Sequence, residues 1–273
     1  QPGRIRVLAA FSERGDHHID PFHVGRSVPL GIAIGPALAT GGVRFVVRPR
    51  PANVQRLVLR PGVGTLDGGG RRLGPDAADL AGIRPYRPGD PVRDLHARSW
   101  ARIGVPVVRE YREDPAAAVA LLVDLDAGGA LAAASEAAVT LAAGIVLALH
   151  RTESLAGLGG EDGLLWLQGR PRAAEVALDA LARLKVQAIA PERWISSLAA
   201  HGRRVSEVLW VLSSASPERL EVARQLRAQG LPTRLFLPLS PPRRGAALAE
   251  VPPDPSLTPL SAAAITSGQA LSL

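Results

Sequence analysis

Residues 118–150 read AVALLVDLDAGGALAAASEAAVTLAAGIVLALH, and this stretch decides the fold. The run Ala118–Val123 is apolar without interruption and ends in Asp124, which is typical of a central strand buried on both faces of a sheet. Ser135 suits the N-cap of a helix that reaches about His150, and this helix is apolar nearly all round. The stretch therefore predicts a buried strand followed by a buried helix.

Strands and helices continue to alternate downstream of this stretch. Such alternation predicts an α/β fold, a mostly parallel sheet flanked by helices. The expected elements after residue 150 are, in order, the strands Ser154–Leu158 and Leu164–Gln168 joined as a hairpin, helices that open at Pro171 and Pro191, the strand Val208–Leu212, a helix between Ser216 and Gly230, and the strand Thr233–Leu237.

Composition shifts divide the chain into four expected regions. These are a small β-rich region at 1–80, an Arg-rich segment at 81–115, the α/β domain at 116–240 and a loosely ordered Pro/Ala-rich tail at 241–273. The first region carries short β-type runs between Gly and Pro residues, which predict a small antiparallel sheet. These runs are Arg4–Ala9, Val28–Ile34, Val43–Val47 and Gln55–Leu59.

Composition also limits the classes of protein to which the chain can belong. Hydrophobic residues make up 47% of the 273 residues but aromatic residues only 4%, so the core is built from Ala, Leu and Val. There is no Cys, which excludes disulfides and thiolate metal sites. The net charge of +7 rests on arginines spread along the chain, because Lys185 is the single lysine. We therefore expect a solvated basic surface and no nucleic-acid partner, and rank nucleic-acid binding third among the functions.

No stretch of the sequence is typical of a signal peptide or a membrane span. The most apolar part, residues 116–149, is interrupted by Asp124, Asp126 and Glu136, which makes it too charged to cross a bilayer. The chain begins at Gln1 rather than Met, and we interpret it as a trimmed or partial sequence.

The segment from Gly82 to Glu110 reads GIRPYRPGDPVRDLHARSWARIGVPVVRE. It resembles the signature of the bacterial domain of unknown function 58 family, in which Arg-x-Tyr-x-x-Gly-Asp precedes an Arg, a His, Ala-Arg-x-Gly and Val-Arg-Glu. The family usually has Trp directly after the His, whereas here Ala97 stands there and Trp100 follows three residues later. The matching residues are Arg84, Tyr86, Pro88, Gly89, Asp90, Arg93, His96, Ala101, Arg102, Gly104, Val108, Arg109 and Glu110.

This resemblance implies a fold, a partner and a location. The fold is a von Willebrand factor A-like domain after the signature, and the partner is a MoxR-type AAA+ ATPase. Relatives often carry two N-terminal membrane helices, so the expected location is the cytoplasm, either free or as the cytosolic part of an inner-membrane protein. The expected function is a non-enzymatic adaptor in the assembly or maturation of protein complexes. The expected binding residues are Arg84, Tyr86, Gly89, Asp90, Arg93, His96, Arg102, Arg109 and Glu110.

The residue types of the signature admit a structural and a functional interpretation. Pro88–Pro91 is a turn sequence, and arginines alternate with carboxylates along the segment. Bidentate Arg–carboxylate pairs can fix an irregular segment and pin it to the α/β domain, which is the interpretation we favour. The same surface can instead dock a partner ATPase. No motif places a Ser or Cys nucleophile beside His96, so we expect a hydrogen-bonded structural histidine.

Asp124 lies where a ligand would bind in an α/β sheet, beyond the carboxyl end of a strand. Von Willebrand factor A domains often place Asp-x-Ser-x-Ser here, and its oxygens hold Mg²⁺. In this chain Asp126 replaces the first Ser and Gly128 the second, while Ser213 and Ser214 stand where the distant Asp is sought. We therefore expect a degraded metal site and no cofactor, with Mg²⁺ at Asp124 and Asp126 as the minor alternative.

The pair Asp124-x-Asp126 also permits an enzymatic alternative, a Mg²⁺-dependent haloacid dehalogenase-like phosphatase. Asp124 would be the nucleophile, Asp126 the acid/base, Ser213 the hydroxyl residue and Lys185 the positive clamp. The later acidic pair that holds Mg²⁺ in such enzymes has no candidate in the last strands, and the upstream signature has no place in them. We therefore expect no enzyme, and keep this phosphatase as the alternative.

Overall fold

The computed structural model describes most of the chain in several stretches. The described residues are 8–21, 23–25, 27–28, 33–34, 38–39, 41–59, 79–112, 118–125, 132–160, 163–187, 191–201, 205–240 and 254–273.

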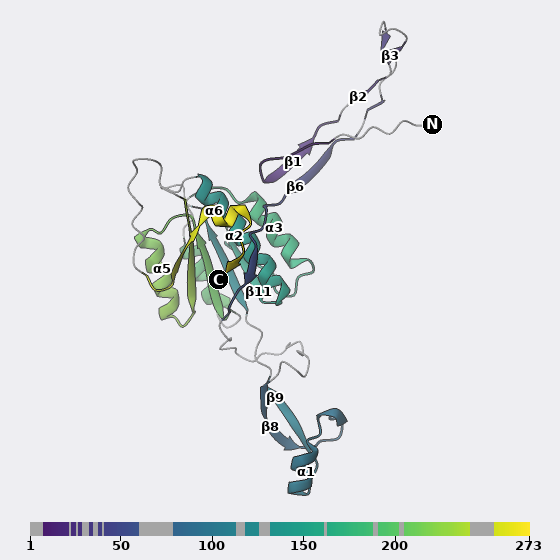
Figure 1. Cartoon of the computed structure of the whole chain (residues 1–273), viewed down its shortest axis with the longest axis vertical. Helices are drawn as coiled ribbons and strands as arrows, with labels where there is room; N and C mark the ends of the chain where they lie inside the picture. The colour runs from purple at the N-terminus through teal and green to yellow at the C-terminus, as the bar shows by residue number, and fades with distance from the viewer. Residues whose placement is uncertain are drawn as a thin grey trace.

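A six-stranded sheet forms the centre of the protein (Figure 1). Only the edge strand β12 runs antiparallel, as the second half of a hairpin with β11. The other neighbouring pairs are parallel, so the expected α/β fold with a mostly parallel sheet is confirmed. In sheet order the strands are β12 (Gly163–Trp166), β11 (Leu155–Gly160), β10 (Val119–Asp124), β13 (Glu207–Leu212), β14 (Thr233–Leu239) and β15 (Leu257–Ser261).

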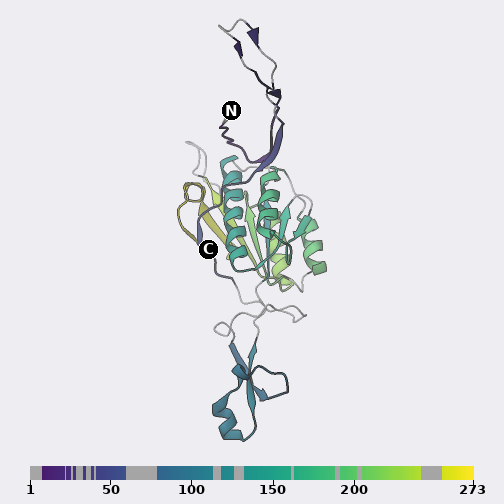
Figure 2. The ribbon, with the colours of Figure 1, turned by 90° about the vertical axis from the view of Figure 1, so that its right-hand side faces the viewer.

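Helices cover both faces of this sheet, so the domain has three layers (Figure 2). One buried cluster joins the sheet to α2 (Ala132–Arg151), α3 (Ala173–Arg183) and α6 (Ala262–Ser267). The other cluster joins it to α4 (Glu192–His201) and α5 (Pro217–Ala228). Alternate residues of each central strand feed the two clusters, because successive side chains of a strand point to opposite faces.

The stretch that begins the domain folds as its sequence predicts. Every residue of β10 is buried, and its apolar side chains divide between the two clusters. Helix α2 starts three residues before the expected cap, so Ser135 is a buried residue of its first turn rather than the N-cap. The sequence signal was correct about the type of each element and less exact about its ends.

The C-terminal tail differs from the expected loosely ordered segment. Residues 241–253 lie outside the described residues, but β15 extends the sheet beside β14 and α6 packs on α2. The last strand, β16 (Leu271–Ser272), pairs with β7 (Val54–Arg56). The prediction was wrong here because the Pro- and Ala-rich composition hid two apolar anchors, Ala262 and Ile265, which are buried in the core.

Residues around β7 come early in the sequence but belong to the sheet domain. Ala52 and Val54 are buried in the cluster that contains α2, and the Ala52 backbone N–H donates to the Thr140 carbonyl at 2.9 Å. A Cβ atom on Gly144 would lie 2.5 Å from the Ala52 carbonyl oxygen. Glycine is therefore required at this point of α2, because the backbone of another segment passes against it.

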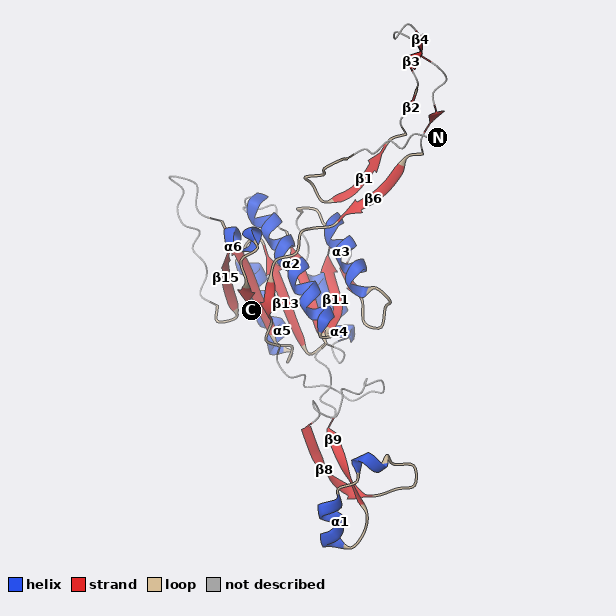
Figure 3. Cartoon of the chain, turned by 45° about the vertical axis from the view of Figure 1, so that its right-hand side comes forward, coloured by secondary structure: helices blue, strands red, loops and turns tan. Residues whose placement is uncertain are grey.

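The N-terminal part forms a projecting antiparallel ribbon, which we call the arm (Figure 3). Its base is β1 (Gly15–Ile19) paired with β6 (Val43–Val47), as the run Val43–Val47 predicts. The expected strand Val28–Ile34 is instead divided between the two short strands of a hairpin, and residues 4–7 of the first expected run lie outside the described residues. The arm continues through the pairs β2 (His23–Val24) with β5 (Leu38–Ala39) and β3 (Ser27–Val28) with β4 (Ala33–Ile34).

The family-like signature forms a small unit of its own. The strands β8 (Asp79–Pro85) and β9 (Val107–Arg112) pair antiparallel. Between them lie a single 3₁₀ turn, η1 (Val92–Asp94), and the helix α1 (Ala97–Ile103), neither of which the sequence pattern indicated. In Figures 1 and 3 this unit stands apart from the six-stranded sheet.

One described helix, α2, is long and apolar enough to cross a membrane by length and composition alone. Of the qualifying window at Ala133–Arg151, however, 72% is buried within the fold. The strand-plus-helix interpretation of residues 116–149 therefore agrees with the structure, in which α2 is the central helix of one core.

Candidate functional site

The carboxylate of Asp124 lies at the topological switch point of the sheet, where successive strands are added on opposite sides of β10. From β10 the chain continues to β11 on one side, and β13 pairs with β10 on the other. Ligands of open α/β sheets bind at this switch point, outside the carboxyl ends of the strands. Asp124 ends β10, and the Ser213 backbone N–H donates to its carbonyl at 3.0 Å, so both candidate residues lie at this edge.

The carboxylate is nevertheless occupied by another side chain of the same chain. Arg219 Nε donates to Asp124 Oδ2 at 2.6 Å, and Arg219 Nη2 donates to Oδ1 at 3.2 Å. The Asp124 side chain is 0% exposed and the Arg219 side chain 9%. The two groups therefore form a bidentate ion pair that is removed from water.

The start of α5 holds this arginine in place. Ser216 caps the helix by accepting from the Arg219 backbone N–H at 3.4 Å, and its Oγ also accepts from Arg219 Nη1 at 3.0 Å. Pro217 occupies the first helical turn, where its fixed φ suits a helix start. The Ser-Pro start thus sets both the helix and the direction of the guanidinium toward the β10 end.

These contacts decide how well Asp124 could bind Mg²⁺. Both oxygens of the Asp124 carboxylate accept bonds from a fixed cation, and a divalent ion at this point would be repelled by the same guanidinium. Asp126 and Gly128 lie outside the described residues, and no cluster of three or more His, Asp or Glu side chains suited to a metal occurs among those described. The described residues therefore do not fit a Mg²⁺ ion at Asp124.

Two further features of this edge bear on the phosphatase alternative. Ser213 is buried, and its Oγ has no hydrogen-bond partner among the residues that the structure describes. The Gln187 backbone N–H donates to the Leu125 carbonyl at 2.9 Å, which brings the segment containing the exposed Lys185 to the same edge. Three of the four residues of the phosphatase hypothesis thus come from segments that meet here, while Asp126 is outside the described residues.

Within the signature, an Arg–carboxylate pair fixes the predicted turn. Arg84 Nη1 and Nη2 donate to the two Asp90 carboxylate oxygens at 2.8 and 2.9 Å, and the Arg87 backbone N–H adds a third bond at 2.8 Å. Gly89 has φ +103°, a conformation that favours glycine. The Arg84 guanidinium, followed by the Arg87 backbone bond, lowers the pKa of Asp90 to about 2. This pair stabilises the signature turn internally.

His96 has a structural contact of the predicted kind. Its Nδ1 accepts from the Ser99 backbone N–H at 3.3 Å and lies 2.6 Å from Ser99 Oγ, so the imidazole caps α1. Gly104, at φ +80°, ends the same helix. The His96 backbone N–H also donates to the Val107 carbonyl at 2.9 Å, which ties the start of α1 to β9.

The other predicted binding residues lie in the same unit. Tyr86 is half-buried, and its backbone N–H donates to the Pro106 carbonyl at 2.9 Å. Arg93, Arg102 and Arg109 are exposed. Glu110 lies in β9, and its side chain is outside the described part. The structure therefore brings the signature residues together in one unit, and separates them from the Asp124 edge.

Sequence reasoning missed the most informative residue, Arg219. It follows the Ser216-Pro217 helix start by two positions, as one arginine among many, and no spacing rule links it to a strand end 95 residues earlier. The sequence could have indicated such a partner only by combining two features, the buried position of Asp124 at a strand end and the loss of the usual metal ligands. A buried carboxylate without a metal requires another positive group, and an arginine can supply it.

Comparison with known proteins supports the resemblance noted in the sequence. The model of one family, described as "Protein of unknown function DUF58", matches residues 82–198, which cover the signature unit and the first part of the sheet domain as far as α4. No curated protein and no solved structure matches the chain. Residues 82–198 therefore match the model of the DUF58 family, and the function of that family is unknown.

Proposed function

We propose that this protein is a non-enzymatic interaction module that works with a MoxR-type AAA+ ATPase in the assembly or maturation of protein complexes. The choice of the ATPase as the partner rests on the resemblance of the signature to the family. The observation that supports a non-enzymatic role is the buried, bidentate Asp124–Arg219 pair, because a carboxylate held by an arginine is a poor nucleophile and a poor metal ligand.

The proposal includes a von Willebrand factor A-like fold for the sheet domain. The strand order, the antiparallel edge hairpin after the first helix and a strand-end aspartate support this assignment. In this proposal the metal-binding edge of such a domain has become a structural ion pair. We further propose that the protein works in the cytoplasm, free or as the cytosolic part of an inner-membrane protein.

A binding experiment tests the adaptor proposal. The full chain is immobilised, and the purified MoxR-type ATPase of the same organism is passed over it with ATP, with ADP and without nucleotide. We expect a saturable complex whose affinity depends on the nucleotide. The absence of a complex under all three conditions would rule the proposal out.

The phosphatase remains the second candidate, because Ser213 and the Lys185 segment lie at the same sheet edge as Asp124. Release of phosphate from a general phosphate ester, with added Mg²⁺, tests it directly. Activity that is present in the wild type and lost in Asp124→Asn would favour the enzyme over the adaptor. We expect no release above background from either chain.

A further inference from the structure

Helix α1 is held by its two ends rather than by a core. It has seven residues, which is far below the length at which a helix is stable alone in water. His96 caps its start and Gly104 its end, and none of its residues is buried. The caps therefore preform a short helix that contacts β9 on one side and leaves most of its side chains exposed.

The surface of α1 combines large apolar side chains with arginines. Trp100 is 43% exposed and Ile103 55%, and these two are neighbours at i, i+3 on one side of the helix. Arg98 and Arg102 are exposed neighbours at i, i+4 on the other side. Val105, directly after the helix, is 50% exposed. We call these five residues the α1 surface.

The signature unit buries too little to account for these exposed apolar groups. Of the hydrophobic side chains described between residues 83 and 109, Val107 and Val108 are the buried ones. Units of fewer than about 40 residues seldom hold a fold without further support. The unit therefore needs an apolar cover beyond its own residues. The α1 surface holds three of the five large apolar side chains that are exposed in the described part of the unit, and the other two are Ile83 and Val92.

The distribution of charge along the chain indicates which kind of molecule could cover the α1 surface. Residues 1–117 contain 18 arginines and 11 acidic residues, whereas residues 118–273 contain 14 basic and 14 acidic residues. The net charge of +7 thus lies entirely in the part of the chain that contains the signature. Between residues 83 and 109 there are six arginines and two aspartates, and both aspartates are paired, Asp90 with Arg84 and Asp94 with Arg93. The neutral sheet domain offers no opposite net charge, so an acidic surface from outside the chain complements this region best.

We propose that the α1 surface is the docking site for an acidic protein surface with an apolar pocket, which receives Trp100 and Ile103 while its carboxylates pair with Arg98 and Arg102. Trp and Arg are the residue types that contribute most to protein interfaces. Arginine, rather than lysine, supplies every positive charge here, and its planar group binds carboxylates with two bonds. The inference rests on the proposed function, since it places the ATPase contact on this surface.

The test measures the affinity of the full chain for the MoxR-type ATPase in two surface variants and one control. The variants are Trp100→Ala and the double change Arg98→Glu with Arg102→Glu. The control reverses two exposed arginines of the sheet domain, Arg170→Glu with Arg193→Glu. We expect each surface variant to weaken binding by about tenfold or more and the control by less than about twofold. The salt dependence of binding should fall in the double variant alone.

The outcomes separate this inference from the proposed function. If the wild type does not bind the ATPase, both fail. If the wild type binds and the surface variants bind equally well, the docking site is wrong and the adaptor function stands. A lower melting temperature of Trp100→Ala with unchanged binding would show that the chain itself covers α1, which also overturns the inference. Binding to vesicles of phosphatidylglycerol and phosphatidylcholine is measured for the same proteins. If the surface variants lose binding to the vesicles but keep their affinity for the ATPase, the inference of a protein docking site is overturned.

Discussion

At the scale of single residues, two arginines decide the chemistry of two different sites. Arg219 neutralises Asp124 inside the sheet domain, and Arg84 holds Asp90 in the signature turn. The first pair is buried, so its members depend on each other. The second is only half-buried, so its effect is more local and shows mainly in the titration of Asp90.

We expect Arg219→Gln to lower the free energy of unfolding by about 3–5 kcal/mol, because it leaves a buried carboxylate without its partner. Asp124→Asn should cost a similar amount by stranding the arginine. The double change Asp124→Leu with Arg219→Met should be closer to wild type than either single variant, and urea unfolding measures all three. An Asp124→Asn protein as stable as the wild type would contradict the structural role of the pair.

The low pKa of Asp90 predicts a pH effect of defined sign. Its folded-state pKa, about 2, lies below the ordinary value of 3.8, so ionised Asp90 stabilises the turn above about pH 4. That stabilisation should be lost as the pH falls from about 4 to 2. Carboxyl ¹³C shifts followed by NMR should give a midpoint near pH 2 in the wild type and one nearer 4 in Arg84→Gln. Equal midpoints in the two proteins would disprove the pairing.

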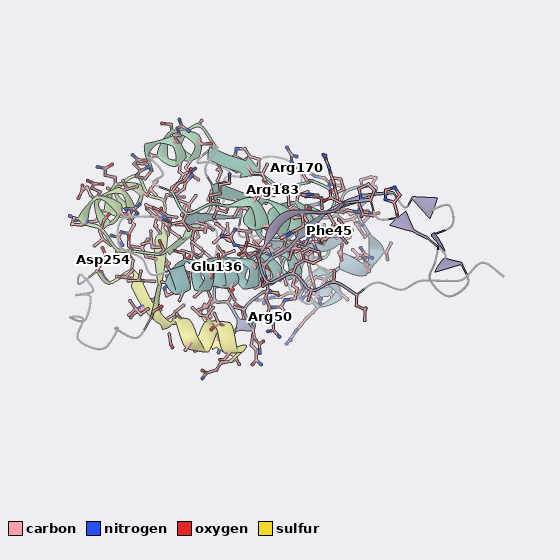
Figure 4. All side chains as sticks on the ribbon, turned by 90° about the horizontal axis from the view of Figure 1, so that it is seen from above. Phe45, Arg50, Glu136, Arg170, Arg183 and Asp254 are labelled. Atoms are coloured by element: carbon pink, nitrogen blue, oxygen red, sulfur yellow. The ribbon has the colours of Figure 1, made fainter. Side chains whose placement is uncertain are left out.

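At the scale of elements, long-range hydrogen bonds and ion pairs attach the N-terminal part of the chain to the sheet domain. Arg14 Nη1 donates to the carbonyls of Leu181, Ala182 and Leu184 at 3.0, 3.1 and 2.5 Å, which places a cation on the C-terminal end of α3. Arg14 also pairs with Glu136 of α2 at 3.1 Å. Figure 4 labels Glu136 and Arg183 at this junction.

Further ion pairs join the arm to α3 from both of its strands. Arg48 pairs with Asp179 at 2.6 Å, and Asp16 pairs with Arg183 at 2.9 Å. The Arg183 guanidinium lowers the pKa of Asp16. The arm is thus held to α3 largely by charged and polar contacts.

We expect Arg14→Ala to loosen the arm without unfolding the sheet domain. Its side chain is half-buried and makes several bonds that water replaces only in part, so backbone exchange in β1 and β6 should quicken by about tenfold. Hydrogen–deuterium exchange measures this by segment. Arg44→Ala, an exposed change in β6, is the control and should leave exchange unchanged. Slower or unaltered exchange in Arg14→Ala would contradict this anchoring role.

The C-terminal segment offers a second test at this scale. Ile265 of α6 is 1% exposed in the core beside α2. We expect Ile265→Ala to cost about 2–4 kcal/mol of unfolding free energy, as for other large buried aliphatic side chains. Gln269→Ala, exposed and just after α6, should change it by less than about 0.5 kcal/mol. A loosely ordered tail would instead give no difference between the two variants.

At the scale of the whole molecule, stability is unevenly distributed. The sheet domain has two apolar clusters, one on each face, whereas the signature unit has only Val107 and Val108 buried among its described side chains. The residues that match the family model therefore include part of the well-packed sheet domain and most of the signature unit, which buries few side chains of its own.

We expect a peptide of residues 79–112 to be unfolded by circular dichroism, because its buried apolar area is too small to offset chain entropy. Addition of the MoxR-type ATPase should induce structure in the peptide, if that protein is the cover. The peptide with Trp100→Ala is the matched control and should stay unfolded. A wild-type peptide that folds alone would show that the unit needs no cover.

The sequence by itself determined the α/β class, the hairpin after the first helix, the strand-end position of Asp124 and the family resemblance. Each of these depends on periodicity, on turn residues or on a contiguous motif, and such local patterns are visible in one dimension. Tertiary structure alone decided that Arg219 fills the space beside Asp124, that residues 254–273 complete the sheet domain, and that Ala52 packs against Gly144. These contacts join residues tens to hundreds of positions apart. Their partners are ordinary Arg, Ala and Gly residues, whose roles depend on where the fold places them.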